Sequence, residues 1–113
     1  MSQLHDADVV NNLKGLIGED KFSVILSSSR QSLEGIIDEL KSAHQSNDLE
    51  TMRRAAHSIK SSVGNYGAIS ISEKAQVMEH QYKDGILDTA AEDIEELATM
   101  VQNVLVELEA YLQ

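Results

Sequence analysis

Five residues between positions 53 and 64 combine the side-chain types that could hold an anionic group. They supply two cations, an imidazole, a hydroxyl and a position without a side chain: Arg53, Lys60, His57, Ser61 and Gly64. On a helix that turns by about 100° per residue, their spacing places them in one continuous strip beside an apolar stripe. We call these five residues the basic strip. It is expected on the exposed flank of a buried helix, where it could receive something anionic.

The chemistry that this strip could perform centres on its imidazole. Histidine has an ordinary pKa of about 6.5, so near pH 7 most of it is neutral and keeps a ring nitrogen free for attack. Lys60 is one turn beyond His57 and could reach the oxygens of a phosphoryl group on the ring as a mobile point charge. Gly64 costs a helix about 1 kcal/mol relative to alanine, and close approach of a partner surface would explain it.

The charge distribution singles out the same segment. The chain carries 9 basic and 19 acidic residues, for a net charge of −10. Yet no Asp or Glu occurs from Thr51 to Ser72, whereas no Lys or Arg occurs from Asp84 to Gln113. One electropositive segment therefore stands in an acidic chain. The overall charge argues against nucleic acid or an anionic membrane as a partner.

The segment from Arg53 to Ala68, RRAAHSIKSSVGNYGA, resembles the signature of the histidine-phosphotransfer (HPt) domain family. In that signature A-H-x-L-K-G-S is followed by a small, glycine-containing stretch that ends in G-A. The resemblance implies an antiparallel four-helix bundle in which His57 is phosphorylated at Nε2. It further implies that Lys60 steadies the phosphoryl oxygens, that Ser61 and Gly64 line the docking surface, and that Glu79 lies near the histidine.

Two positions depart from the family pattern. Ser61 stands where the family usually has glycine, directly after the motif lysine, and Val63 replaces the second residue of the usual serine pair. A small serine could still clear a partner or add a hydrogen bond. The helical phase places Val63 in the core.

The resemblance also implies the partners and the absence of a cofactor. The expected partners are receiver domains, one of a hybrid sensor kinase and one of a response regulator, with Mg²⁺ held by the receiver rather than by this chain. No phosphate-binding loop or nucleotide-binding lobe occurs, so we expect a phosphohistidine carrier without autokinase activity. The main alternative is a non-catalytic helical adaptor that docks acidic protein partners. A hydrolase that uses His57 with Ser61 or Ser62 lacks an identifiable orienting acid.

Composition and periodicity predict an all-α fold with one domain over residues 1–113. Hydrophobic residues make up 42% and charged residues 25%, and proline and cysteine are absent. These features fit an ordinary bundle without disulfides or thiolate metal sites. We expect a short first helix and four long antiparallel ones. No segment predicts a signal peptide or a membrane span, so the expectation is a freestanding, cytoplasmic monomer, with a fragment of a hybrid kinase as the alternative.

Local signals set the expected boundaries. The first helix is predicted over 6–17 and the second over 20–46. Asn47 with Glu50, and Ser70 with Glu73, are interpreted as capping boxes that open the next two helices. Gly67 and Gly85 are expected to end those helices, and Asp88 or Thr89 to open the last one.

Apolar residues at three- and four-residue spacing predict the buried faces. The predicted core comprises Val9, Val10, Leu13, Leu16, Ile17, Phe22, Ile25, Leu26, Leu33, Ile36, Ile37, Leu40, Ala43, Leu49, Met52, Ala56, Ile59, Val63, Ile71, Ala75, Met78, Tyr82, Ile94, Leu97, Val101, Val104, Leu105, Leu108 and Leu112. The three histidines outside the strip, His5, His44 and His80, are expected to be structural or merely exposed.

Overall fold

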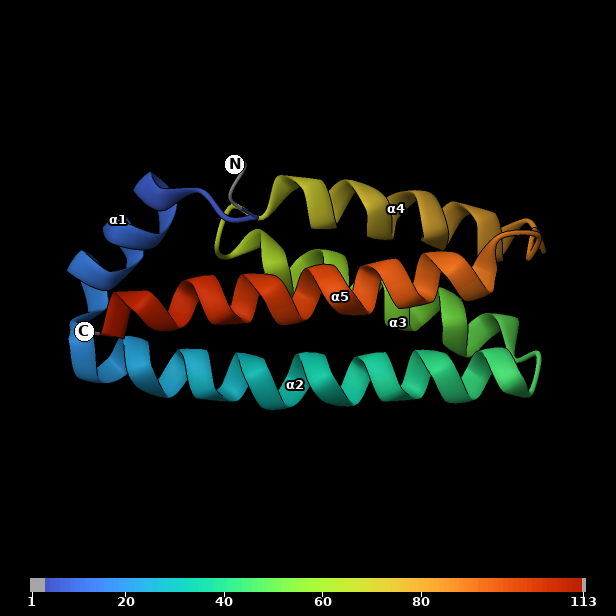
Figure 1. Cartoon of the computed structure of the whole chain (residues 1–113), viewed down its shortest axis with the longest axis horizontal. Coiled ribbons are helices and arrows are strands. Elements are labelled where there is room, and N and C mark those ends of the chain that lie inside the picture. The colour runs from blue at the N-terminus through green and yellow to red at the C-terminus, as the bar shows by residue number, and fades with distance from the viewer. Residues whose placement is uncertain (1–3, 113) are drawn as a thin grey trace.

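Four long helices pack side by side and a shorter one closes an end of the bundle (Figure 1). The computed structural model describes residues 4–112; residues 1–3 and 113 of the expected domain lie outside that range. The helices are α1 (Ala7–Ile17), α2 (Glu19–Gln45), α3 (Leu49–Gly64), α4 (Ile69–Lys83) and α5 (Ala90–Glu109), followed by a short 3₁₀ turn, η1 (Ala110–Leu112). The predicted all-α fold is confirmed: α2 to α5 run alternately up and down, and α1 is the extra helix.

The start of α3 corrects one predicted cap. Asp48, not Asn47, is the N-cap, and its carboxylate accepts from the Thr51 backbone N–H at 3.2 Å and from the Thr51 hydroxyl at 2.6 Å. Asn47 instead adopts a positive φ of 55°, a conformation that asparagine tolerates better than most residues. The predicted box of Asn47 with Glu50 is therefore wrong by one position.

The α3–α4 turn corrects two further boundaries. The third helix ends at Gly64, before the predicted stop, and Gly67 takes the left-handed φ of 66° inside the turn. The fourth helix begins at Ile69 with Ala68 as its N-cap and without a side-chain cap, so Ser70 is already helical and its predicted capping box is wrong. At α5 the predicted Thr89 is the N-cap, although its hydroxyl donates to Asp93 Oδ2 instead of accepting from a backbone N–H.

The core follows the predicted periodicity in α2 to α5 and departs from it in α1. The predicted inward positions of α4 are all buried, as are those of α5 up to Leu108, whereas Leu112 and Leu49 are only half-buried. In α1 only Val10 is fully buried, and Leu16 is 85% exposed. Val9 and Ile25, both predicted inside, are exposed as well. For α1 the reason is geometric, because this helix closes one end of the bundle and can bury only a narrow line of contacts; Ile25 is an exception within α2.

No helix in residues 4–112 has the length and apolar character that crossing a membrane requires.

The Tyr82 hydroxyl yields a stability prediction. It is buried, and the described residues offer it no hydrogen-bond partner. Burial, reinforced by the charge of Asp93, raises the pKa of Tyr82 to about 12. An unsatisfied buried hydroxyl costs about 1–3 kcal/mol, so we expect Tyr82→Phe to be as stable as the parent or more stable in urea unfolding at pH 7. A clear loss of stability would show that the hydroxyl has a partner.

The same variant has a predictable alkaline behaviour. Tyrosine in an unfolded chain ionises near 10.0, whereas folded Tyr82 keeps its proton to about 12, so stability falls as pH rises through that interval. Tyr82→Phe should lose less stability between these pH values than the parent does.

Candidate functional site

His57 stands on α3 with one ring nitrogen bonded and the other free. Its side chain is 55% exposed, and Nδ1 lies 3.1 Å from Oε2 of Glu79 on α4. A carboxylate can only accept, so we assign the ring proton to Nδ1 and the lone pair to Nε2. Among residues 4–112 no side chain or backbone group bonds to Nε2. The nitrogen that could act as a nucleophile is therefore the one without a partner, on a side chain that is exposed.

Glu79 joins the histidine to the lysine of the basic strip. Its other oxygen, Oε1, accepts from Lys60 Nζ at 3.2 Å, and its side chain is only 15% exposed. Burial acts to raise the pKa of this carboxyl, but the Lys60 hydrogen bond and charge, with a smaller effect of His57, lower the pKa overall. Glu79 is thus ionised at neutral pH, and its charge is matched by Lys60.

The remaining members of the strip lie on the same face with different surroundings. Arg53 is partly exposed and pairs with Glu50 one turn earlier, at 2.7 Å, which raises its pKa, with a further contribution from Glu79. Ser61 and Gly64 are exposed. A Cβ atom at Gly64 would meet nothing within 4 Å, so the bundle's own packing does not require glycine there.

A shallow groove continues this surface beyond Gly64. It has a volume of about 150 Å³ and lies between the end of α3 and the start of α4, with Gly64, Gly67, Ala68 and Ile69 in its lining. Ile69 is 63% exposed, an unusual position for a large apolar side chain. The strip and the groove together form one face that carries an imidazole, cations and exposed apolar surface.

His5, expected to be structural or merely exposed, is structural and belongs to a cluster that no sequence pattern predicted. The His5 side chain is 1% exposed, and its Nδ1 and Nε2 lie 2.7 Å from Glu107 Oε1 and 2.6 Å from the Tyr111 hydroxyl. His44 is half-buried and His80 exposed. Only the separation of the chain positions hid the cluster, because no local pattern links residue 5 to residues 107 and 111.

No group of three or more potential metal-binding side chains (His, Cys, Asp or Glu) gathers within residues 4–112.

Comparison with known proteins places this geometry in a family. The Hpt domain family profile matches residues 24–107, which run from within α2 to near the end of α5 and include the whole basic strip and Glu79. The chain therefore belongs to the Hpt domain family, and the resemblance drawn from residues 53–68 is confirmed. Proteins of this family carry phosphoryl groups in phosphorelays and interact with receiver domains.

A solved structure gives the same assignment. The chain is similar to histidine-containing phosphotransfer protein B (HptB) from Pseudomonas aeruginosa PAO1, with 25% identity and a TM-score of 0.91. The superposition covers 100% of this chain and 97% of that one, so α1 belongs to the shared architecture although the family profile begins after it. Comparison with curated protein sequences gives no match.

The lowered pKa of Glu79 leads to a prediction about acid stability. A carboxyl whose folded pKa lies below its unfolded value stabilises the fold above the unfolded value, here near 4.5, and loses this contribution as pH falls through the folded pKa. Glu79→Gln should therefore be less stable than the parent at pH 7. The difference should persist to about pH 5 and shrink below 4.5 in urea unfolding. A difference that does not change with pH would show that the charge of Glu79 is not its source.

Proposed function

We propose that His57 is the phosphorylated residue, and that it takes a phosphoryl group from the aspartyl phosphate of one receiver domain and passes it to the aspartate of another. The observation that carries this proposal is the hydrogen bond that His57 Nδ1 donates to Glu79, which leaves Nε2 of an exposed side chain as the nitrogen with the lone pair. Family membership supports the class of reaction and the class of partner. A hybrid sensor kinase and a response regulator in the cytoplasm would supply the two receivers.

The transfer step requires only one nucleophile from this chain. The Nε2 lone pair forms the N–P bond while the bond from phosphorus to the aspartyl oxygen breaks, and the aspartate leaves as a carboxylate. The ring becomes cationic in this step, and Glu79 stabilises it as the acceptor of the Nδ1 proton. The reverse step, with a second aspartate as the nucleophile, regenerates neutral His57.

Lys60 is placed to act on the phosphoryl group without acting as its acceptor. Its ammonium shares Glu79 with His57, so it is held on the side of the ring that faces α4. From there a flexible lysine could swing to the equatorial oxygens as charge develops on them. We propose that Mg²⁺ is brought by the receiver, so that this chain provides the nucleophile, its orientation and one cation. No cofactor of its own and no autokinase activity is part of this proposal.

The docking surface is proposed to comprise the face around His57. Arg53, Ser61 and Gly64 border the imidazole on α3, and Ile69 supplies exposed apolar area across the groove. The basic strip complements an acidic receiver surface. A single bundle of this kind offers one such face to each partner in turn, which fits a monomer that shuttles between receivers.

The direct test is His57→Gln, which removes the nucleophile and keeps a polar side chain of similar reach. We expect complete loss of acid-labile, base-stable phosphorylation from acetyl-phosphate-loaded receivers, with an unchanged helical circular dichroism spectrum. His44→Gln and His80→Gln serve as matched controls and should transfer normally. Phosphorylation of the His57→Gln protein would refute the proposal. If His57→Arg still binds receivers tightly while the parent is never phosphorylated, the adaptor function holds instead.

The glycine at position 64 gives a second test, because stability and docking should respond in opposite directions. Nothing lies within 4 Å of a Cβ at Gly64, so Gly64→Ala should raise stability by up to about 1 kcal/mol through helix propensity. The added methyl should nevertheless weaken receiver binding about tenfold, since a closely docked surface tolerates little bulk. Gly35→Ala in α2 is the matched control, with equally open space and no place on the docking face. Equal binding by both variants would remove Gly64 from the interface.

A further inference from the structure

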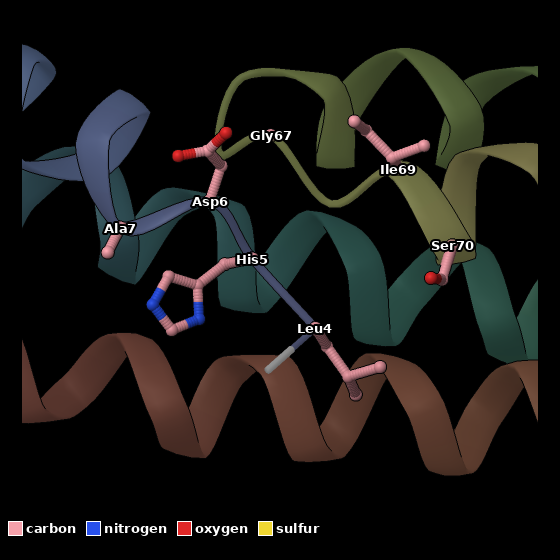
Figure 2. Close-up of a pocket in the computed structure, with 7 residues that line it drawn as sticks. All are labelled: Leu4, His5, Asp6, Ala7, Gly67, Ile69 and Ser70. Atoms are coloured by element: carbon pink, nitrogen blue, oxygen red, sulfur yellow. The ribbon is translucent and has the colours of Figure 1, made fainter. Parts of the chain in front are cut away.

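Residues Leu4, His5 and Asp6 form a non-helical segment, here called the strap, that lies between α5 and the α3–α4 turn. Figure 2 shows the strap running between α5, drawn in red-brown, and the turn at Gly67. On one side the Leu4 backbone N–H donates to Glu107 Oε1 at 2.9 Å. On the other side the Asp6 backbone N–H donates to the carbonyl of Tyr66 at 3.0 Å. The strap therefore connects two elements that are far apart in sequence.

His5 anchors the strap with two side-chain bonds. Its Nδ1 lies 2.7 Å from Glu107 Oε1 and its Nε2 2.6 Å from the Tyr111 hydroxyl, and the Tyr111 ring meets the imidazole edge-on with centroids 5.2 Å apart. Burial, with the charges of Glu107 and Asp6, raises the pKa of Tyr111. Because the Glu107 carboxylate can only accept, we assign the ring proton to Nδ1, and the Tyr111 hydroxyl then donates a hydrogen bond to Nε2. Lys14 of α1 adds a bond to the Tyr111 carbonyl.

This order of hydroxyl, imidazole and carboxylate also occurs in nucleophilic hydrolases, but its chemistry here is different. In such a hydrolase the imidazole must reach both the hydroxyl and a bound substrate. Here the imidazole is enclosed, with 1% of its side chain exposed. The cluster therefore holds the strap in place and carries no reaction.

The strap packs directly against the α3–α4 turn. A Cβ atom at Gly67 would lie 2.5 Å from Asp6 Cβ and 3.2 Å from Val9 Cγ2, so strap, α1 and turn are in close contact at this point. Gly67 holds a left-handed φ of 66° there. Behind the turn, the Tyr66 hydroxyl bonds Ser29 of α2 at 2.7 Å. The turn is thus clamped between α2 and the strap.

The same turn also lines the groove beside Gly64. Gly67 and Ile69 border both this groove and the hollow in Figure 2 that the strap forms. A shift of the strap therefore displaces the lining of the groove that belongs to the proposed docking face. The side chains of His57 and Lys60, in contrast, are oriented by Glu79, which makes no hydrogen bond to the strap.

We propose that His5, Glu107 and Tyr111 are positioning residues for partner docking: they lock the strap, and the locked strap gives the α3–α4 turn the shape that a receiver domain recognises. This inference rests on the proposed function. According to this inference, the His5 cluster maintains the docking surface, whereas Glu79 orients His57. Loss of the His5 hydrogen bonds should therefore weaken docking and leave the reactivity of His57 unchanged.

The test separates docking from chemistry with two phosphoryl donors. One is a phosphorylated receiver domain, for which KM and kcat of transfer are measured. The other is phosphoramidate, a small donor that needs no docking surface and passes its phosphoryl group to Nε2 with release of ammonia. Tyr111→Phe keeps the ring and deletes one hydrogen bond, and His5→Phe deletes both bonds of the imidazole.

We expect Tyr111→Phe to raise the KM for the receiver about fivefold, the factor that one net hydrogen bond represents, with a larger rise in His5→Phe. The kcat and the rate of labelling by phosphoramidate should stay within about twofold of the parent. Tyr82→Phe is the matched control, because it deletes a hydroxyl that has no partner in residues 4–112. Ile37→Val controls for lowered stability, since this buried residue lies in α2, away from the strap.

Two results would overturn the inference. An unchanged KM in both His5→Phe and Tyr111→Phe would show that the strap does not shape the docking face. A matching rise of KM in Ile37→Val at equal loss of thermal stability would show that the effect is general destabilisation. Failure of the proposed function is recognised separately, because the parent protein would then take no label at His57 from either donor.

Discussion

The carboxylate of Glu79 is the contact on which the proposed chemistry depends. It accepts from His57 Nδ1 at 3.1 Å and from Lys60 Nζ at 3.2 Å, and it reaches both from a neighbouring helix. One half-buried charge thereby sets the tautomer of the proposed nucleophile and the location of the cation. The arrangement requires α3 and α4 to keep a fixed rotation about their own axes, because a rotated helix would turn Glu79 away from His57 and Lys60. The buried residues on the inner faces of these helices, such as Ile59, Ala75 and Met78, provide that constraint.

The charge distribution explains why this contact is specific. The segment from Thr51 to Ser72 contains no carboxylate of its own, so its cations cannot be neutralised from within. Arg53 turns back to Glu50 just before the segment, and Lys60 turns across to Glu79. The two cations beside His57, Arg53 and Lys60, are therefore each paired with a carboxylate. An exposed imidazole in such surroundings can gain positive charge during transfer with a carboxylate already in place.

The sequence predicted the fold class, the buried faces of α2 to α5 and the grouping of the basic strip, because helical periodicity is a local property of the chain. It failed where several local patterns were equally good. Asn47 and Asp48 are both suitable N-cap residues for α3. Asp48 is the N-cap because Asn47 takes the positive φ that the connection from α2 needs. Ser70 fits a capping box, yet the turn through Gly67 lets the helix start earlier, at Ile69. Periodicity also overestimated the burial of α1, since a helix at the end of a bundle has few neighbours.

The pairing of Glu79 with His57 could be expected only by resemblance to the family, and the His5 cluster could not be expected at all. Both depend on contacts between helices, and the second joins positions 102 and 106 residues apart. The two histidines show how the same side chain acquires opposite roles. His5 has both ring nitrogens bonded and is enclosed, so it has no lone pair to offer and can only hold structure. His57 has an exposed side chain and only one bonded nitrogen, so the bond that orients the ring leaves a lone pair for the proposed reaction. The number of hydrogen bonds on each imidazole thus separates the structural His5 from His57, the proposed nucleophile.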